Sequence, residues 1–493
     1  MCIILAYLLI WGGWFVKKIV SNIMKYLISF FFSITSCILL YYVNKLNILK
    51  PIYYTLLCMI VVFLWLIINY KIYSSKTRII PKIIFILLSI VLSISYSYFI
   101  NYASNTVDFL KKITKKEEYK IQKYSVFVLN NSNINEINDL EGSNLGFISS
   151  NLNIDKVISK LNKSINYNNL NYENIGTLVY GMYNNEIKAI VLEDSYIQLI
   201  QESNLTFLEE YKIIYSFEIK IKKDARQTKK IDINYEPFIV YISGSDSRGT
   251  IYDVSRSDVN ILAVINPQTN KILLLTIPRD YYVQLHGTTG AKDKLTDAGL
   301  YGIDMSKSTI EDLLDIEINY YVKVSFNTLV NLVDVLDGID IYSDTAFEGF
   351  TQDRTKCIYK VGIQHLNGKC TLRFVRERKK LSGGDRHRGT NQQQVITKII
   401  EKLKQPKYLV NYNNILKSMD GTFETDITYD EITNFIKYQL TNLTNWQIKS
   451  ISVDGTDIMS ETYTFGKQKL SVMVPDEKTI EIAKEKIKEY LEK

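Results

Sequence analysis

The chain has 493 residues, 46% of them hydrophobic and 23% charged, which is enough for two or three domains with buried cores. This composition excludes an intrinsically disordered protein. The formal net charge of +7 is carried without any block of like charges, which argues against nucleic acid as a partner.

The first hundred residues hold three apolar stretches, at 26–43, 52–68 and 80–100, each close to the ~20 residues that a membrane-spanning helix needs. Basic residues precede the first stretch and join the second to the third. By the positive-inside tendency, the remainder of the chain faces the outside of the cell membrane. Residues 1–15 are also apolar, but they are short for a span and lack a cleavage site. We therefore predict that residues 1–23 precede a true start at Met24, which an intact mass that includes Met1 would refute.

The next part of the chain predicts an accessory domain. Membrane helices are expected over 24–102, a polar juxtamembrane linker over 103–123 and a small α/β domain over 124–230. Its strands are predicted at 124–129, 145–148 and 189–192, and a helix at 154–161. Because this region shows no catalytic constellation, we expect an accessory or spacer role.

The third region, residues 231–493, begins with an apolar strand at 238–242. Two more strands are predicted at 259–265 and 272–277, and a C-terminal helix at 477–491. Charged residues stand where these strands begin or end. They are Asp246 and Arg248 after the first strand, Arg256 and Asp258 before the second, and Arg279 and Asp280 after the third.

If the three strands are neighbours in one sheet, these side chains gather along one edge, where open α/β sheets bind ligands. Paired carboxylates at Asp246 and Asp258 suit magnesium, which prefers oxygen ligands, and guanidinium forks suit the phosphates that it bridges. Asp280 is instead expected to cap a turn.

A second polar cluster follows at 372–394. If Leu372-Arg-Phe-Val-Arg-Glu-Arg378 is a strand, Arg376 and Arg378 point to one side and Arg373 to the other. The later part of the cluster leads into an amphipathic helix, on which Arg388 and Gln392 would stack four residues apart. An exposed basic loop held by salt bridges is the alternative.

Arginine is concentrated in the third region. Only eleven of the 59 basic residues are arginine, and nine of those lie between Arg248 and Arg388. A chain that otherwise uses lysine for charge thus uses the bidentate guanidinium here, which suits phosphate oxygens. We therefore predict a phosphate-binding site, with scattered surface arginines as the alternative.

Two cysteines, Cys357 and Cys370, fall outside the apolar runs. Their spacing and the absence of a matching histidine pattern argue against a zinc site. A disulfide and two free thiols both remain open, and thiol labelling of the unreduced protein distinguishes them.

Eight motifs occur in order between residues 236 and 405. They are Gly244-Ser-Asp-Ser-Arg248, Arg256-Ser-Asp258, Ile277-Pro-Arg-Asp280, Lys294-Leu-Thr-Asp-Ala-Gly-Leu-Tyr-Gly302, Ile318-Asn-Tyr-Tyr-Val322, Val333-Asp-Val-Leu-Asp-Gly-Ile-Asp340, Phe374-Val-Arg-Glu-Arg378 and Asp385-Arg-His-Arg-Gly-Thr-Asn-Gln392. This region resembles the LytR-CpsA-Psr family of cell-wall glycopolymer ligases, and the layout with three spans and an accessory domain is similar to its capsule-associated CpsA branch. The resemblance implies a membrane-anchored α/β chain whose α/β/α catalytic domain has a central mixed sheet.

The resemblance also implies a phosphotransferase. A glycopolymer, either capsular polysaccharide or a teichoic-acid-like polymer, would pass from a polyprenyl-pyrophosphate carrier to a peptidoglycan hydroxyl and leave a phosphodiester link. Asp246 and Asp258 would hold magnesium. The pyrophosphate would be held by Arg248, Arg256, Arg279, Arg376, Arg378, Arg388 and Gln392.

Catalysis of this kind rests on charge neutralisation rather than on a protein nucleophile. The resemblance implies four catalytic residues, Asp246, Asp258, Arg279 and Asp385. Asp385 would orient the arginines, and it and a magnesium-bound aspartate remain alternatives for the base. The Arg386-His387 pair departs from the family pattern and predicts a different head group. Apolar runs at 261–264, 273–275 and 329–335 belong either to the core or to a tunnel for the lipid.

Three other functions are open: a carrier-binding protein without turnover, a pyrophosphatase, and a membrane-bound transcriptional attenuator of envelope genes. Magnesium-dependent phosphate release separates an enzyme from a pure binder. The attenuator is disfavoured because the sequence shows no helix-turn-helix and the arginine-rich region is predicted outside the cell.

Overall fold

The computed structural model describes all residues except 1, 115–118, 150–152, 198, 201–206, 223–230, 246–250, 252–254, 383, 404, 406–407, 409–411, 443–445 and 493. The chain forms two compact units. The first comprises Met1–Lys112 and Tyr429–Leu443, and the second comprises Ile113–Thr428 and Thr444–Lys493.

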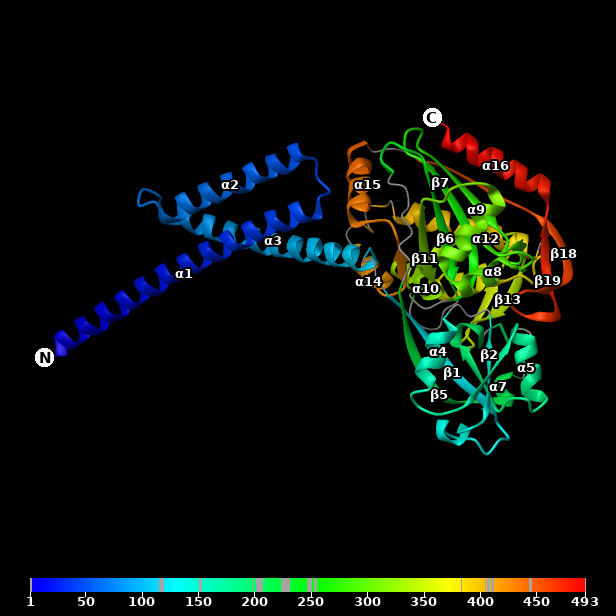
Figure 1. The fold of residues 1–493 in the computed structure, drawn as a ribbon. Coiled ribbons are helices and arrows are strands. Elements are labelled where there is room, and N and C mark those ends of the chain that lie inside the picture. Colours follow the sequence, from blue (N-terminus) through cyan, green and yellow to red (C-terminus); the bar gives the residue numbers. More distant parts are fainter. Residues whose placement is uncertain are drawn as a thin grey trace. The chain divides into compact units, whose positions relative to one another are not determined.

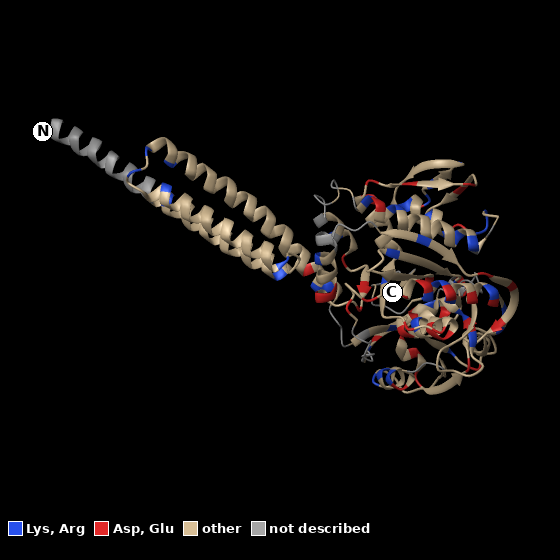
Figure 2. Cartoon of the chain, turned by 90° about the horizontal axis from the view of Figure 1, so that it is seen from above, with Lys and Arg blue, Asp and Glu red and all other residues tan. Residues whose placement is uncertain are grey.

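Three long helices dominate the first unit: α1 (Cys2–Leu46), α2 (Pro51–Tyr73) and α3 (Ile79–Ile113) (Figure 1). Each contains a stretch long and apolar enough to cross a membrane, at Ile23–Leu46, Pro51–Tyr73 and Ile79–Ile113. Figure 2 shows these helices mostly tan, with blue residues near their ends. Large apolar side chains such as Phe30 and Phe63 are exposed along them, as lipid-facing residues are. These helices support membrane anchoring.

Side-chain hydrogen bonds join separate elements of the first unit. The indole Nε1 of Trp65 on α2 donates to Ser33 Oγ on α1 over 2.7 Å, which satisfies both groups in apolar surroundings. The unit also includes α15 (Tyr429–Asn442), whose Tyr429 hydroxyl donates to the carbonyl of Lys45 over 2.8 Å. The helix α3 continues to Ile113, so the first half of the segment expected as a linker at 103–123 is helical.

The accessory domain is a five-stranded sheet with strand order β3-β2-β4-β1-β5. Its strands are β1 (Tyr119–Leu129), β2 (Asn144–Ile148), β3 (Asn168–Tyr172), β4 (Ala189–Glu193) and β5 (Tyr211–Lys222). Its helices are α4 (Ile154–Leu161), α5 (Ile175–Tyr183) and the short α7 (Phe207–Glu210), with 3-10 turns η1 (Ile137–Leu140) and η2 (Asp194–Tyr196). The predicted strands and helix of this region all appear, because their apolar residues fill the two cores on either side of the sheet.

The part of the second unit that follows the accessory domain is built on a six-stranded sheet with order β16-β11-β6-β7-β8-β17. The strands are β6 (Phe238–Ser245), β7 (Ser257–Asn266), β8 (Lys271–Ile277), β11 (Tyr320–Ser325), β16 (Phe423–Thr425) and β17 (Gln447–Ser452). The sheet is mixed, because β6, β7 and β8 pair antiparallel while β11 and β17 pair parallel with β6 and β8. The central strands are buried on both faces, which explains their nearly continuous apolar sequence.

Helices cover both faces of this sheet, as expected for an α/β/α domain. Leu275 of β8 packs in a core with α9 (Ile303–Leu314) and α16 (Glu477–Leu491). The next residue, Thr276, faces the other side, where its Oγ1 accepts a 2.8 Å hydrogen bond from Gln393 of α12 (Asp385–Leu403). The apolar runs at 261–264 and 273–275 are buried in this domain. On the face of α12 also lie α10 (Phe326–Val335), α11 (Gly368–Arg376) and α14 (Tyr412–Met419).

The described part of the second unit also contains four two-stranded sheets. They are β9 (Tyr282–Gln284) with β10 (Lys292–Lys294), β12 (Ile339–Ser343) with β15 (Gly362–Leu366), β13 (Phe347–Phe350) with β14 (Lys356–Tyr359), and β18 (Gly455–Thr462) with β19 (Gly466–Pro475). A short helix, α8 (Leu295–Ala298), and the turn η3 (Gly299–Tyr301) follow β10 directly.

The prediction of a strand at 372–378 is wrong, because most of this segment belongs to helix α11. The side chain of Asn367 caps the helix by accepting a 2.9 Å hydrogen bond from the amide of Cys370, and Phe374 and Val375 bury its apolar side. The cysteine alternatives are resolved as well, since Cys357 of β14 and Cys370 of α11 form a disulfide with 5.7 Å between their Cα atoms.

Candidate active site

Three strand ends meet at one edge of the six-stranded sheet. Because β7 runs antiparallel to both β6 and β8, the start of β7 lies beside the ends of its two neighbours. Arg256 precedes β7, Asp258 lies within it and Arg279 follows β8, so the sheet gathers these three residues as predicted. Asp246 and Arg248 lie outside the described residues.

Asp258 is surrounded by cations. Its Oδ1 accepts hydrogen bonds from Nη1 of Arg279 over 2.5 Å and from the Thr296 hydroxyl over 3.2 Å. The side chains of Asp258 and Arg279 keep exposed fractions of 12% and 14%. Burial opposes ionisation of Asp258, but Arg279 and then Arg256, Arg388 and Arg376 outweigh it, and the pKa lies below its usual value. Asp258 is therefore a stable carboxylate within electrostatic reach of four guanidinium groups.

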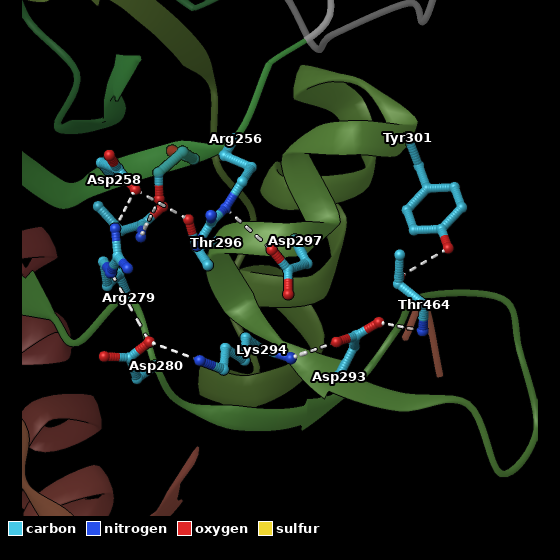
Figure 3. Close-up of polar contacts among 12 residues, drawn as sticks. Arg256, Asp258, Arg279, Asp280, Asp293, Lys294, Thr296, Asp297, Tyr301 and Thr464 are labelled. Atoms are coloured by element: carbon cyan, nitrogen blue, oxygen red, sulfur yellow. Dashed lines mark hydrogen bonds and ion pairs between the residues drawn. The ribbon is translucent and has the colours of Figure 1, made fainter. Parts of the chain in front are cut away.

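Asp280 is part of the same cluster, not merely a turn cap (Figure 3). Its Oδ1 lies 3.3 Å from Nζ of Lys294 and 3.6 Å from Nε of Arg279, and its Oδ2 accepts from Nη1 of Arg378 over 3.0 Å. Burial raises the pKa of Asp280, but these cations and Arg388 together lower it by more. The pKa therefore lies below its usual value. The expectation of a turn cap missed this role, although Lys294 opens one of the eight motifs.

A second carboxylate missed from the sequence is Asp297. Its Oδ1 lies 3.1 Å from Nε of Arg256, and the two side chains have exposed fractions of 0% and 2%. Figure 3 shows Asp297 on the helix after Lys294, with its carboxylate directed at Arg256. This pair is more buried than the pair of Asp258 and Arg279. The motif from Lys294 to Gly302 could have indicated this role, because Asp297 stands in it among apolar and small residues. A carboxylate buried in such surroundings needs a charged partner.

The helices on the other side of the site supply further cations. Arg376, at the end of α11, lies with its guanidinium carbon 4.8 Å from the ring centroid of Phe326. Arg378 follows the helix and binds Asp280. Arg388 and Gln392 are one turn apart on α12 and both line a cleft against Asp258 and Arg279.

Arg386, where the sequence departs from the family pattern, lines the same cleft. Its Nε pairs with Asp454 and its Nη2 donates to the carbonyl of Gly455 over 2.5 Å. Arg386 is thereby fixed at the cleft wall instead of projecting from a loose loop. Asp385 begins α12, but its side chain lies outside the described residues.

The donor set for a metal ion is described only in part. Among the described residues, no group of three or more His, Cys, Asp or Glu side chains could hold a metal ion. Asp258 offers one carboxylate at the cleft, and magnesium commonly binds through one or two carboxylates plus substrate phosphates. The residues present therefore fit a magnesium ion that binds together with a phosphate ligand.

Residues 210–481 match the model of the LytR_cpsA_psr family. The chain belongs to this family. Relatives named polyisoprenyl-teichoic acid–peptidoglycan teichoic acid transferase TagU share 32% identity with it. For the protein of Bacillus cereus ATCC 14579, the match spans 239 residues, which are 48% of this chain and 76% of the relative. For that of Bacillus anthracis CDC 684, it spans 253 residues, 49% of this chain and 81% of the relative.

Solved structures of similar proteins include TagV and TagU of Bacillus subtilis. TagV is 28% identical, with a TM-score of 0.45, over 52% of this chain and 98% of its own. TagU is 29% identical, with a TM-score of 0.40 over the same shares. The LytR_cpsA_psr match includes all eight motifs and leaves most of the accessory domain outside it.

Proposed function

We propose that this LytR-CpsA-Psr member transfers a glycopolymer from a polyprenyl-pyrophosphate carrier to a hydroxyl of peptidoglycan. The observation that carries the proposal is the cluster of guanidinium groups around Asp258 at the cleft. The names of the relatives support a polymer of the teichoic-acid type and peptidoglycan as the acceptor. The three apolar helices, with the basic residues that flank them, support an active site outside the cell membrane.

The arginines would bind the pyrophosphate and stabilise charge in the transition state. Arg279 is held by Asp258, and Arg378 by Asp280, so the ends of both side chains are positioned before the substrate arrives. Such preorganised cations stabilise charge that develops on phosphate oxygens without reorganisation during the reaction. Arg376, Arg388 and Gln392 extend the same binding surface, and Arg248 is expected to join it. The buried guanidinium of Arg256 adds positive charge behind this surface.

The reaction exchanges one phosphorus–oxygen bond for another. The bond between the glycan-bearing phosphorus and the bridging oxygen of the pyrophosphate breaks, and polyprenyl phosphate leaves. The hydroxyl oxygen of peptidoglycan bonds to that phosphorus, and its proton passes to a base. The lowered pKa of Asp258 makes it a weak base at neutral pH, which leaves Asp385 and Asp246 as the candidates for this role.

Magnesium would be held by Asp258 and Asp246. When bound, it would neutralise charge on the phosphate oxygens. The bond of Asp258 to Arg279 uses one carboxylate oxygen, and in the described part of the chain the other oxygen accepts no hydrogen bond. This arrangement supports simultaneous contact with an arginine and an ion.

The test uses the full chain in lipid nanodiscs, because α15 belongs to the same unit as the three apolar helices. The chain is incubated with a polyprenyl-pyrophosphate-linked glycan and peptidoglycan oligomers, with and without magnesium, and the glycan-phosphate-peptidoglycan adduct is sought by mass. Arg279→Ala should abolish the adduct, whereas Arg78→Ala, in the exposed loop before α3, should not. Free glycan phosphate without an adduct would identify a pyrophosphatase, and tight binding without cleavage a carrier-binding protein.

A further inference from the structure

A short segment, residues 293–301, connects the active site to the accessory domain. One side of this segment contacts the active site in three places. Lys294 binds Asp280, Thr296 binds Asp258, and Asp297 pairs with Arg256. These contacts hold both carboxylates at the cleft and the buried arginine behind it (Figure 3).

The other side of the segment belongs to the core of the accessory domain. Leu300 is buried in an apolar cluster with Ile175 and Leu178 of α5, and Tyr301 packs against the same cluster. Phe465, from the turn between β18 and β19, is also part of it. The segment that binds the active-site acids is therefore packed directly against the accessory domain.

The turn between β18 and β19 forms a second bridge. The first amides of α5, from Ile175 and Gly176, donate to the carbonyls of Thr464 and Phe465 over 3.2 and 3.0 Å. The amide of Thr464 in turn donates to Oδ2 of Asp293 over 2.7 Å. The Thr464 hydroxyl lies 2.9 Å from that of Tyr301. Helix α5 thus holds the turn, and the turn holds both ends of the segment.

Both junctions are closely packed at a glycine. A Cβ added to Gly176 would lie 2.7 Å from the carbonyl oxygen of Phe465. A Cβ added to Gly299 would lie 2.6 Å from the carbonyl oxygen of Ser255 and 2.8 Å from the amide of Ser257. The accessory helix therefore touches the turn backbone to backbone, and the segment touches the residues on both sides of Arg256 in the same way.

We propose that the accessory domain positions the phosphate-binding site, by holding residues 293–301 so that Asp297 fixes the guanidinium of Arg256. This inference rests on the proposed function, which makes Arg256 part of the pyrophosphate site. The physical reason is the complete burial of the pair: opposite charges out of water attract strongly, so a displacement of Asp297 draws the guanidinium of Arg256 with it. Arg256 lies two residues before Asp258, and Thr296, the neighbour of Asp297, donates to Asp258 over 3.2 Å, so such a movement reaches the cleft. Asp297 is in this sense a positioning residue.

The experiment compares two substitutions in the same helix. Gly176→Ala places a methyl group against the turn, whereas Gly181→Ala places one against the ring of Tyr172 inside the accessory domain. Binding of geranylgeranyl pyrophosphate to the full chain in nanodiscs with magnesium is measured by calorimetry, and folding is checked by thermal melting. We expect Gly176→Ala to raise the Kd about tenfold, or ~1.4 kcal/mol, with Gly181→Ala close to wild type.

Each other result has a defined meaning. A wild-type Kd in folded Gly176→Ala overturns the inference, and so does an equal loss in both variants, because the effect would then not act through the turn. If Gly176→Ala does not fold, Tyr301→Phe decides, since it removes only the hydroxyl at Thr464. A threefold or larger rise in Kd supports the inference, and a smaller one overturns it. Failure of the wild type to bind the probe refutes the proposed function instead.

Discussion

Arg256 and Asp297 form an ion pair inside the catalytic domain, with 3.1 Å between Nε and Oδ1 and almost no exposed side-chain surface. Removing one partner from a buried pair leaves an uncompensated charge, which costs about 3–5 kcal/mol. Replacing both partners by apolar residues avoids this cost, so stability and binding can be separated at this position.

We predict that Asp297→Ala lowers the melting temperature sharply, and that Arg256→Met combined with Asp297→Leu recovers most of the loss. The double variant should bind polyprenyl pyrophosphate more weakly than wild type even though its stability is restored, because it lacks the guanidinium. Thermal melting and calorimetry on the same preparations check both statements. Full recovery of affinity in the double variant would show that Arg256 serves the fold and not the ligand.

Asp280→Asn should reduce glycopolymer transfer while leaving the fold intact. The carboxylate holds Arg378 and Lys294, and a charge-assisted hydrogen bond contributes about 1.5–3 kcal/mol, so a loss of roughly tenfold or more is expected. The rate of adduct formation measures it. Asp312→Asn is the matched control, since this aspartate is exposed and pairs with His286 at the surface. If the two variants form the adduct at equal rates, Asp280 only caps a turn, as expected from the sequence.

The contrast between Asp258 and Asp280 illustrates what sequence can predict. Strand ends and family motifs were sufficient to place Asp258, Arg256 and Arg279 together, because the strand pattern fixes which ends share an edge. Asp280 depends on Lys294 and on Arg378, which come from distant parts of the chain. Local pattern contains no information on such partners.

Two further differences have equally specific causes. The alternation in residues 372–378 mimics a strand, but the Asn367 cap and the apolar side of α11 decide for a helix. The sequence analysis did not predict that α15 belongs to the first unit, where Tyr429 contacts Lys45, a residue far away in the sequence. By contrast, α16 and the accessory strands β1, β2 and β4 follow from the local pattern of apolar residues alone.

The disulfide between Cys357 and Cys370 should stabilise the part of the domain that presents Arg376 and Arg378. It ties β14 to α11, the helix from which both arginines emerge. A closed loop of this size contributes about 3 kcal/mol in the chain-entropy model. We expect Cys357→Ser with Cys370→Ser to lower the melting temperature and to match wild type treated with reductant. Replacing Cys37 and Cys58, which are free thiols, should change nothing.

Asp293 should make stability depend on pH near neutrality. Burial, and then the nearby charge of Asp297, raise the pKa of Asp293 to about 7, against its usual ~3.9 in an unfolded chain. Hydrogen bonds from Thr464 and from the amide of Lys294 lower it only in part. The folded chain therefore binds this proton more tightly than the unfolded chain does.

The sign of the dependence follows from linkage. The stabilisation from this proton is fully present below about pH 4, and it is lost as the pH rises through about 7. Asn cannot titrate, so the melting temperature of Asp293→Asn relative to wild type should rise between pH 6 and pH 8.5. Asp426, whose pKa burial raises to about 6, is present in both chains and cancels in the comparison. A difference that stays constant over this range would mean that Asp293 is already ionised at pH 6, with its charge balanced by the groups around Thr464.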